Sequence, residues 1–383
     1  MKYDFDSYID RKKSDCFKWD FDKYNKPGMI PMWVADMDFL SPPEILEALH
    51  KRIEHGIFGY TFQPTELVDV IIERLKRLYN WNIKQEWIVW LPGLVTGFNV
   101  ACRATASEND NIATVVPVYY PFLQAPQNNN QTITKIPMLK KDKRWTLDFE
   151  LIEKMVSEKT KMFLFCNPHN PGGTMFKKEE LLKFADICER NNIIICSDEI
   201  HCDLILDKTK NHIPIASLST AIAKRTITLM APSKTYNIAG LGCSFAIIPD
   251  EELRTKYNTA MAGLVPHVNI LGYTAAMAAY KHGDKWLAEL LDYLRDNYKL
   301  IQEYVDKIPG FSMLKHEATY LAWIDVKKTG IKNPIDFFDN IGIGLSNGTD
   351  FCGPGFIRMN FGCPRHILKE ALERIYNAVV NLH

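Results

Sequence analysis

The sequence predicts an α/β fold, in which a mostly parallel sheet is flanked by helices and joined to a smaller α+β domain. Two observations predict it. Short apolar, β-rich runs alternate with helical stretches between residues 87 and 248, and this alternation is typical of βαβ units. A long amphipathic stretch that starts near residue 281 then ends the alternation, which indicates a second unit.

The first elements precede the sheet. Residues 1–42 show little periodicity, so we expect an extended arm that packs on the smaller domain. Pro42 and Pro43 open a helix over about 44–55, and a second helix is expected over 66–79, because apolar side chains recur at helical spacing in both.

The sheet and its helices follow in alternation. Strands are expected at the runs that begin at residues 87, 113, 133, 162, 193, 226 and 245, and helices at 94–106, 148–157 and 178–190. After the long helix, short strands near 311, 319, 343 and 356 alternate with helices near 334–340 and 365–381. We therefore predict a large domain over 48–280 and a small domain made of 1–47 together with 281–383.

Composition restricts the function classes. The 46 Lys and Arg residues balance the 46 Asp and Glu residues, so no global field attracts nucleic acid or an acidic membrane. The start of the chain is polar, and no apolar run approaches the roughly 18 residues of a membrane helix. The balanced charge favours a small-molecule partner. Nine cysteines without a C-x-x-C pair are expected to be buried thiols, which favours a cytoplasmic protein.

Candidate site residues follow the strands, because ligands of such sheets bind outside the carboxyl ends of the strands. In LPGLVTGF, the backbone N–H groups of Val95 and Thr96 open a helix and could hold a phosphate, although a turn glycine alone explains the pattern. In VPVYYPF, Tyr119 or Tyr120 could face a planar ring, or both could be packing residues.

Two further junctions carry polar side chains. Asn170 lies in FCNPHNPGGT, where it could donate to a ligand oxygen or simply belong to a turn. Asp198 and Glu199 follow a run that should be buried on both faces, with His201 close behind. A buried carboxylate needs either a cationic ligand or an internal base, because an unpaired one costs several kcal/mol or becomes protonated.

Two cations complete the candidates. Lys234 follows a strand in APSKTYNIAGLG and is expected to point into the same crevice, although most lysines are solvated surface charges. Arg358 lies inside the strand pattern of FIRMNFGCPR, where it suits a carboxylate ligand or an internal salt bridge. The motifs G-x-G-x-x-G, G-x-x-x-x-G-K-[ST] and H-E-x-x-H do not occur, and we expect no metal site.

In this order the motifs resemble those of a known family. PMWVADMDF, NPHNPGG, DEIHCDL, SKTYNIAGL and RMNFGCPR, spread over about residues 31–365, are similar to those of fold-type I enzymes that use pyridoxal 5′-phosphate (PLP). More narrowly, they resemble the aminotransferase-like carbon-sulfur lyases of the cystathionine β-lyase and cystalysin type, the MalY/PatB group. The resemblance implies the PLP-dependent transferase fold, type I, and PLP as cofactor.

The resemblance also implies roles for the site residues. Lys234 would bind the cofactor covalently and, once released by substrate, shuttle the α-proton. Asp198 would keep the pyridine nitrogen protonated, Asn170 would bond the phenolic oxygen of the ring, and Tyr119 would stack on it. The substrate carboxylate would be held by Arg358, aided by the backbone near Val34 and Ala35. The phosphate would be held by Val95, Thr96 and Ser233, and by Tyr60 of a second subunit in a homodimer with shared active sites.

Three positions depart from the pattern of related transaminases. His201 stands where many of them have a tyrosine beside the ring oxygen, Gly242 stands where they usually have a phosphate-binding arginine, and Ala231 stands where a serine is common. Backbone groups, hydroxyls and the neighbouring subunit must then meet the phosphate charge, and this fits the lyase group better than ordinary transaminases.

The resulting hypothesis is β-elimination from L-cystathionine or a related cysteine S-conjugate, with thiol, pyruvate and ammonia as products. An aminotransferase is the alternative, because proton removal from Cα is common to both reactions. A further alternative is a regulatory protein that binds a transcription activator, a role that a member of this family combines with lyase activity.

Overall fold

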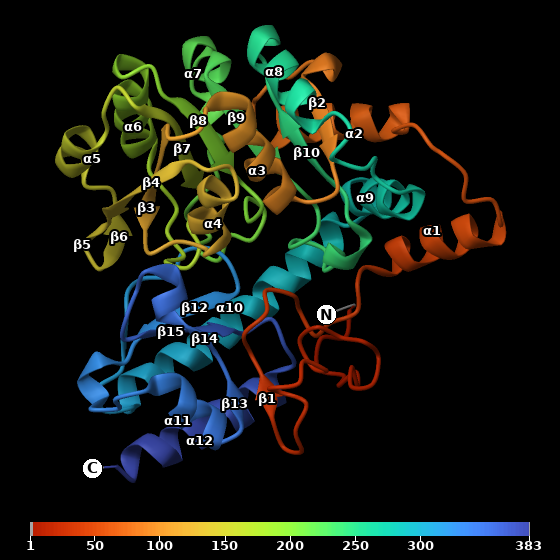
Figure 1. Ribbon diagram of the computed structural model, residues 1–383. Helices are drawn as coiled ribbons and strands as arrows, with labels where there is room; N and C mark the ends of the chain where they lie inside the picture. Colours follow the sequence, from red (N-terminus) through yellow and green to blue (C-terminus); the bar gives the residue numbers. More distant parts are fainter. Residues whose placement is uncertain (1–2, 383) are drawn as a thin grey trace.

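The computed structural model describes residues 3–382 and consists of a larger and a smaller part (Figure 1). The larger part holds a seven-stranded sheet between helices, and the smaller part holds a four-stranded sheet backed by helices. The predicted α/β fold with a smaller α+β part is therefore confirmed. The domain boundaries at residues 48 and 280 stay a prediction.

The central sheet has the strand order β2-β10-β9-β8-β7-β3-β4. Its strands are β2 (Ile88–Leu91), β3 (Asn111–Val116), β4 (Thr132–Pro137), β7 (Thr160–Cys166), β8 (Ile194–Asp198), β9 (Thr226–Met230) and β10 (Ser244–Ile247). The neighbours from β9 to β4 are all parallel, whereas β10 runs antiparallel to both β9 and β2. All seven predicted runs lie in this sheet, which is mostly parallel as expected.

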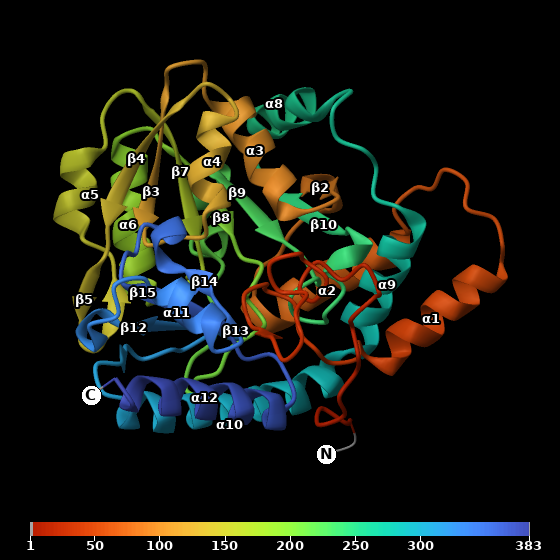
Figure 2. The same ribbon diagram turned by 60° about the horizontal axis from the view of Figure 1, so that its bottom comes forward.

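Helices cover both faces of the central sheet (Figures 1 and 2). The helices of the larger part are α1 (Pro43–Glu54), α2 (Thr65–Tyr79), α3 (Leu94–Thr105), α4 (Pro121–Gln127), α5 (Phe149–Met155), α6 (Lys178–Arg190), α7 (Thr220–Lys224), α8 (Glu251–Met261) and α9 (Ile270–His282). A small hairpin of β5 (Leu139–Lys141) and β6 (Arg144–Thr146) lies beside them. Strands β8 and β9 are almost entirely buried, because helices pack on both of their faces.

The smaller part is built on the long predicted helix, α10 (Asp284–Lys307), which lies beside α12 (Arg365–Val380) (Figure 2). Its sheet has the order β11-β12-β15-β14. The remaining elements are β11 (Ser312–Met313), β12 (Leu321–Asp325), α11 (Pro334–Asn340), β13 (Ile343–Gly344), β14 (Ser346–Asn347) and β15 (Phe356–Asn360). Trp286, Leu290, Leu294 and Ile301 bury the apolar stripe of α10.

The N-terminal arm packs on the smaller part and also reaches the larger one. Its single short strand, β1 (Ile30–Pro31), pairs in parallel with β13. Near the start of the arm, the ring of Phe5 packs edge-on against Phe39 and Trp286. Phe5 and β1 therefore belong to the core of the smaller part.

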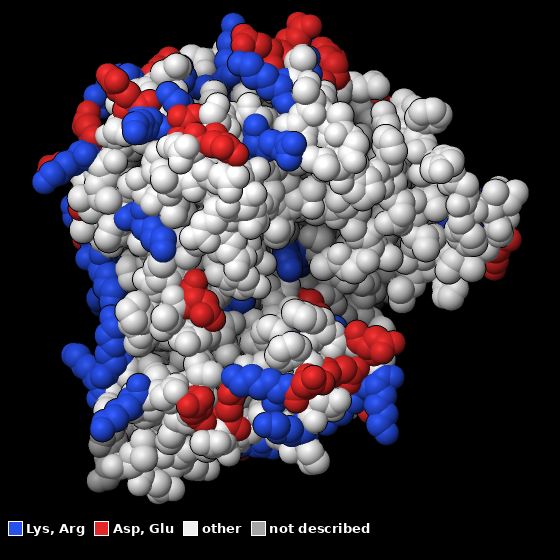
Figure 3. All heavy atoms as spheres, in the orientation of Figure 1, with Lys and Arg blue, Asp and Glu red and all other residues white. Residues whose placement is uncertain are grey.

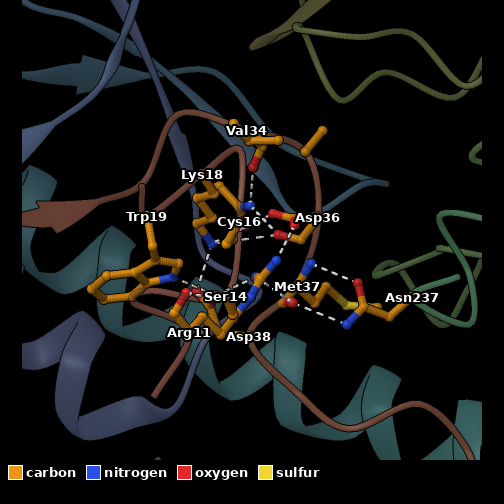
Figure 4. Close-up of polar contacts among 12 residues, drawn as sticks. Arg11, Ser14, Cys16, Lys18, Trp19, Val34, Asp36, Met37, Asp38 and Asn237 are labelled. Carbon is orange, nitrogen blue, oxygen red and sulfur yellow. Dashed lines mark hydrogen bonds and ion pairs between the residues drawn. The ribbon is translucent and has the colours of Figure 1, made fainter. Parts of the chain in front are cut away.

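A buried cluster of charges fixes the arm where it approaches the larger part (Figure 4). Lys18 Nζ lies 2.5 Å from Asp38, and Arg11 bridges Asp36 and Asp38 at 2.6 Å each. Burial alone would lower the pKa of Lys18, but the two carboxylates raise it above its ordinary value. Trp19 Nε1 donates to Asp38 as well. Because breaking a buried pair costs about 3–5 kcal/mol, this cluster holds residues 36–38 firmly.

One asparagine connects the clustered segment to the larger part. The side chain of Asn237 accepts a hydrogen bond from the N–H of Met37 at 2.9 Å and donates to the carbonyl oxygens of Met37 and Phe39 (Figure 4). Asn237 lies three residues after Lys234. The arm is thus tied to the loop that carries the predicted catalytic lysine.

Candidate active site

Two hollows meet at Lys234, between the two parts of the molecule. The first, of about 260 Å³, lies outside the carboxyl ends of the central strands, and the second, of about 440 Å³, lies toward the arm and the smaller part. Lys234, Ala35 and Tyr119 line both. Figure 3 shows the surface hollowed between the two parts, with basic atoms at the bottom of the depression.

Eleven of the twelve predicted site residues line these hollows. The first hollow is lined by Ala35, Val95, Thr96, Tyr119, Asn170, Asp198, His201, Ser233 and Lys234, and the second adds Val34 and Arg358. These residues are distant in the sequence but adjacent in space. Those of the larger part follow central strands that end at the same edge of the sheet, whereas Val34, Ala35 and Arg358 come from the arm and the smaller part.

One end of the first hollow is the N-terminus of α3. Its N-cap is Gly93, which has no side chain to cap the helix, so the N–H groups near Val95 and Thr96 face the hollow at the positive end of the helix dipole. The hydroxyl of Ser233 lines the same hollow. Gly242 forms part of the wall with φ +59°, a left-handed conformation that favours glycine. This arrangement suits a phosphate group.

The deep end of the first hollow holds Asp198, at the end of β8. Its carboxylate accepts a hydrogen bond from the backbone N–H of Ile200 at 3.1 Å, and none of the ion pairs among residues 3–382 involves it. Burial raises the pKa of Asp198 to about 7. The adjacent Glu199 differs, because His212 Nε2 lies 2.7 Å from its carboxylate. From the sequence, either an internal base or a cationic ligand is expected beside these acids. Glu199 has an internal base, His212, whereas Asp198 has none among the described residues.

Asn170 lies between the two hollows, in the loop after β7. Its side-chain oxygen accepts a hydrogen bond from Arg358 Nη1 at 3.2 Å, which leaves its NH₂ group as a donor toward the first hollow. The following glycine, Gly173, has φ +63°, and a Cβ atom there would overlap the ring of His316. The loop is therefore a tight turn, and it also presents the amide of Asn170 to the site.

Lys234 is half-buried in the loop after β9. Its Nζ donates to the carbonyl oxygen of Ala35 at 2.6 Å, and the hydroxyl of Tyr320 donates to the same oxygen at 3.0 Å. Burial lowers the pKa of Lys234 to about 8, and the positive charge of Arg358 acts in the same direction. A lysine with a lowered pKa has a larger fraction of neutral, nucleophilic amine near neutral pH.

Arg358 is a buried cation in the middle of β15. Besides Asn170, its guanidinium donates to the carbonyl of Trp33 at 2.9 Å and to the hydroxyl of Ser346 at 3.3 Å. None of these partners is a carboxylate, so the internal salt bridge that the sequence allowed is wrong. Burial lowers the pKa of Arg358 to about 10, and the group stays charged at neutral pH. A buried guanidinium without a counterion suits an anionic ligand.

The sequence left open how Tyr119, Tyr120 and His201 lie relative to the site. Tyr119 lines both hollows, whereas Tyr120 lines only the second, so the geometry favours Tyr119 as the residue that faces a ring. Burial lowers the pKa of His201 to about 3, and its ring packs edge-on against Tyr320. His201 is therefore neutral, and its buried Nδ1 has no hydrogen-bond partner among the described residues.

Tyr60 is the one predicted site residue that lies outside both hollows. It is fully exposed in the segment between α1 and α2, next to a separate apolar hollow lined by Phe58, Phe62 and Val268. In Figure 1 this segment projects from the body of the molecule. Its contact with the site of a second subunit stays a prediction.

Sequence reasoning missed several polar contacts of the site. Tyr320, Ser346 and Asn360 hold Ala35, Arg358 and the arm carbonyls of Val34 and Asp36, respectively. Tyr320 directly precedes the buried strand β12, Asn360 is the last residue of β15, and Ser346 lies in a two-residue strand. No spacing or composition signal separates them from ordinary core residues.

The donor set fits pyridoxal 5′-phosphate. An uncapped helix N-terminus and hydroxyls suit its phosphate, the unpaired carboxylate of Asp198 suits its protonated ring nitrogen, and the NH₂ group of Asn170 suits its ring oxygen. The buried amine of Lys234, which has no ion-pair partner among residues 3–382, suits its aldehyde. The fold and the site together are those of a PLP-dependent enzyme.

Comparison with known proteins gives the family. Residues 27–375 match the model of the aminotransferase class I and II family, and the chain belongs to this family. Cystathionine beta-lyase PatB of Bacillus subtilis is 36% identical over 386 residues, which cover 98% of this chain and 99% of that protein.

Two solved structures are similar over almost the whole chain. OvoB has a TM-score of 0.96 and 44% identity, covering 98% of this chain and 99% of that one. Cystalysin from Treponema denticola, whose structure contains pyridoxal 5′-phosphate, has a TM-score of 0.96 and 34% identity, covering 100% of both chains. Together with the family match, the PLP-containing structure of cystalysin establishes PLP as the cofactor of this protein.

The buried carboxyl of Asp198 predicts a pH-dependent stability of the cofactor-free protein. Its pKa is raised from 3.8 to about 7, so the folded chain keeps a proton that the unfolded chain loses above pH ~4. The stability that this group contributes therefore falls as the pH rises from about 4 to about 7. In Asp198→Asn this loss is absent, and the variant should gain stability relative to the wild type over this range, by at most about 1.4 kcal/mol per pH unit.

Thermal unfolding of both cofactor-free proteins between pH 4.5 and 7.5 measures this difference. Asp69→Asn, which alters an exposed carboxyl on α2, is the matched control and should follow the wild type. A constant offset between Asp198→Asn and the wild type across the whole range would show that the carboxyl is not held neutral by burial.

Proposed function

We propose that the protein catalyses β-elimination from L-cystathionine or a related cysteine S-conjugate. One molecule of conjugate and one of water would give a thiol, pyruvate and an ammonium ion. The observation that carries the proposal is the position of Lys234 between two hollows, one with the unpaired acid Asp198 and one with the unpaired cation Arg358. The similarity to PatB, named as a cystathionine beta-lyase, favours this reaction within the family.

Several residues would hold the cofactor. The N–H groups of Val95 and Thr96 and the hydroxyls of Thr96 and Ser233 would bind the phosphate at the start of α3. Tyr119 would stack on the ring, with the neutral His201 beside it. The absence of an arginine at Gly242 is compatible with this assignment, because the helix terminus supplies positive charge.

Two polar side chains would control the ring itself. Asp198 would hold a proton on the ring nitrogen, and it would become ionised by doing so, because the pairing offsets the burial that raises its pKa. Asn170 would donate its NH₂ group to the ring oxygen. When bound, pyridoxal 5′-phosphate supplies a ring that withdraws electrons from the substrate Cα.

The remaining residues would act on the substrate. Arg358 would bind the α-carboxylate with two parallel N–H groups, replacing its contacts with Trp33 and Ser346. The backbone at Val34 and Ala35 would close over the substrate. Lys234, with its lowered pKa, would accept the proton from Cα while the thiolate leaves Cβ.

Incubation of the purified, cofactor-loaded protein with L-cystathionine tests the reaction. We expect pyruvate and free thiol in equal amounts. Lys234→Ala should lower the rate at least 1,000-fold, because it removes the group that accepts the proton, whereas Lys224→Ala, an exposed lysine at the end of α7, should keep it.

A parallel assay for amino transfer to a keto acid separates the two reactions that begin with proton loss from Cα. Keto-acid-dependent transfer without thiol release would refute the lyase and support the aminotransferase. Full activity of Lys234→Ala in the elimination assay would contradict the role of this lysine.

The role of Arg358 predicts a change in KM. Arg358→Ala should raise KM for the amino-acid substrate roughly 30-fold or more, since a buried, hydrogen-bonded charge pair is worth at least about 2 kcal/mol. Arg103→Ala, at an exposed position on α3, is the control. Steady-state kinetics measure both, and an unchanged KM in Arg358→Ala would exclude carboxylate binding by this residue.

We also propose that the protein is a cytoplasmic homodimer with shared active sites. Ile57, Phe58, Tyr60 and Phe62 leave large apolar side chains exposed between α1 and α2, and Figure 3 shows few charges on this projection. Exposed apolar patches of this kind favour a protein interface. The nine cysteines are all unpaired, which supports a reducing compartment. No helix among residues 3–382 is long and apolar enough to span a membrane.

Mixing two inactive protomers tests the shared site. If Tyr60 serves the partner's phosphate, Tyr60→Phe should need more cofactor for half-maximal activity. In a random mixture with Lys234→Ala, half of the dimers combine the two variants, and each of these has one intact site. Activity at limiting cofactor should then recover to about a quarter of the wild-type value.

A mixture of Lys234→Ala with Lys234→Arg is the control. Every site in such a mixture lacks the lysine, so no recovery is possible. If Tyr60→Phe and Lys234→Ala protomers exchange, as shown by mass-tagged subunits, and still recover nothing, Tyr60 acts within its own subunit or not at all.

A further inference from the structure

The second hollow has an aromatic wall supplied by the N-terminal arm. Trp33 is at its centre, with ring centroids 5.2 Å from Phe17, 5.3 Å from Phe21 and 5.3 Å from Tyr24. All four rings line the hollow. Phe17 and Phe21 are 65% and 42% exposed, so their faces are free to contact a ligand.

The opposite wall continues into the site. Tyr120 packs edge-on against Phe351 at 6.0 Å, and the guanidinium of Arg358 lies 4.6 Å from the centre of the Phe351 ring. Because Arg358 and Lys234 both line this hollow, a substrate that places its carboxylate on the arginine and its Cα near the lysine directs its side chain between the two aromatic walls.

The charges of the second hollow do not favour a distal carboxylate on the leaving group, and Asp350, which also lines the hollow, would repel one. Lys23, at the rim, is occupied by Asp339 at 2.7 Å and lies over the ring of Tyr24. The other cations that line the hollow, Lys234 and Arg358, face Cα and the carboxylate. Within the described chain, the distal carboxylate of a zwitterionic leaving group would therefore meet aromatic faces and no unpaired cation, and this costs desolvation without a compensating contact.

We propose that the second hollow is the subsite for the leaving thiol and that it takes a flat, aromatic thiol in preference to an aliphatic, zwitterionic one. The proposal rests on the β-elimination proposed above and names the substrate class. Stacked and edge-on contacts with Trp33, Phe21 and Tyr120 would bind the ring of the leaving group, while the C–S bond lies near Lys234.

The arm is built to hold this wall in place. The indole N–H of Trp33 donates to the carbonyl oxygen of Lys18 at 3.3 Å, and the side chain of Lys18 is fixed by Asp38 in the buried charge cluster of Figure 4. On the other side, a Cβ atom at Gly344 would lie 2.8 Å from the Tyr24 ring, so that ring packs directly on the backbone of β13. A wall fixed in this way loses little entropy when a flat ligand binds.

Substitutions of exposed arm residues test the subsite, because they should change the preference of the enzyme between two substrates. We expect Phe21→Ala and Phe17→Ala to lower kcat/KM for S-phenyl-L-cysteine about tenfold, because each removes ring contact area, and to change kcat/KM for S-methyl-L-cysteine less than about twofold. The ratio between the two substrates cancels their different intrinsic reactivity. Tyr8→Ala, which removes an exposed arm ring outside the hollow, should leave the ratio unchanged.

A binding measurement adds a readout without turnover. In L-homophenylalanine a methylene replaces the sulfur of S-phenyl-L-cysteine, so no thiol can leave. Calorimetry on the cofactor-loaded protein should give at least tenfold tighter binding of L-homophenylalanine than of L-2-aminobutyrate, and Phe21→Ala should reduce this difference.

The outcomes separate the two proposals. If no conjugate yields pyruvate, the lyase itself is refuted. If pyruvate forms but Phe17→Ala and Phe21→Ala affect both substrates equally, or L-homophenylalanine binds no more tightly than L-2-aminobutyrate, the aromatic subsite is refuted while the lyase remains. A wild-type kcat/KM for L-cystathionine above that for S-phenyl-L-cysteine would also contradict the subsite.

Discussion

The hydrogen bond from Lys234 to the carbonyl oxygen of Ala35 joins the two parts of the molecule at the point where the chemistry is expected. Its donor follows the central strand β9, and its acceptor belongs to an arm that packs on the smaller part. The acceptor is fixed from both directions, by Tyr320 and by the asparagine and charge cluster that hold residues 36–39. The position of the amine thus depends on contacts made by residues more than 190 positions away in the sequence.

Three ionisable groups of the site lack an oppositely charged partner within ion-pair distance among residues 3–382, and this marks the site more clearly than any single motif. Asp198, Lys234 and Arg358 each have a pKa shifted toward the neutral form, in each case chiefly because of burial. Elsewhere in the core, buried charges such as Lys18 and Glu199 are paired. The other buried charges of the described chain are paired, and these three are not. Unpaired groups lower the stability of the fold, and such a loss at one place is typical of a binding site.

The sequence predicted the parts of the fold that a periodic pattern controls. All seven central strands and the long helix α10 came from alternation and amphipathic spacing. Helices α4, α7, α8 and α9 were not among the helices named from the sequence. Apolar residues surround α9 on most sides and leave no stripe, and α4 is short and contains Pro126. In the site, residues at strand ends were found because topology gathers them, whereas Tyr320 and Ser346 were not, because their contacts arise only from the packing of the smaller part on the arm.

The left-handed backbone at Gly242 restricts how this scaffold can evolve or be redesigned. Related transaminases usually have a phosphate-binding arginine at this point of the chain, and here φ is +59° with the carbonyl oxygen of Pro92 3.3 Å from where a Cβ would lie. An L-amino acid in that conformation costs roughly 1–2 kcal/mol before its side chain makes any contact. A single codon change that installs the arginine therefore carries this strain and a contact a few tenths of an ångström too tight, so it costs stability unless the turn relaxes.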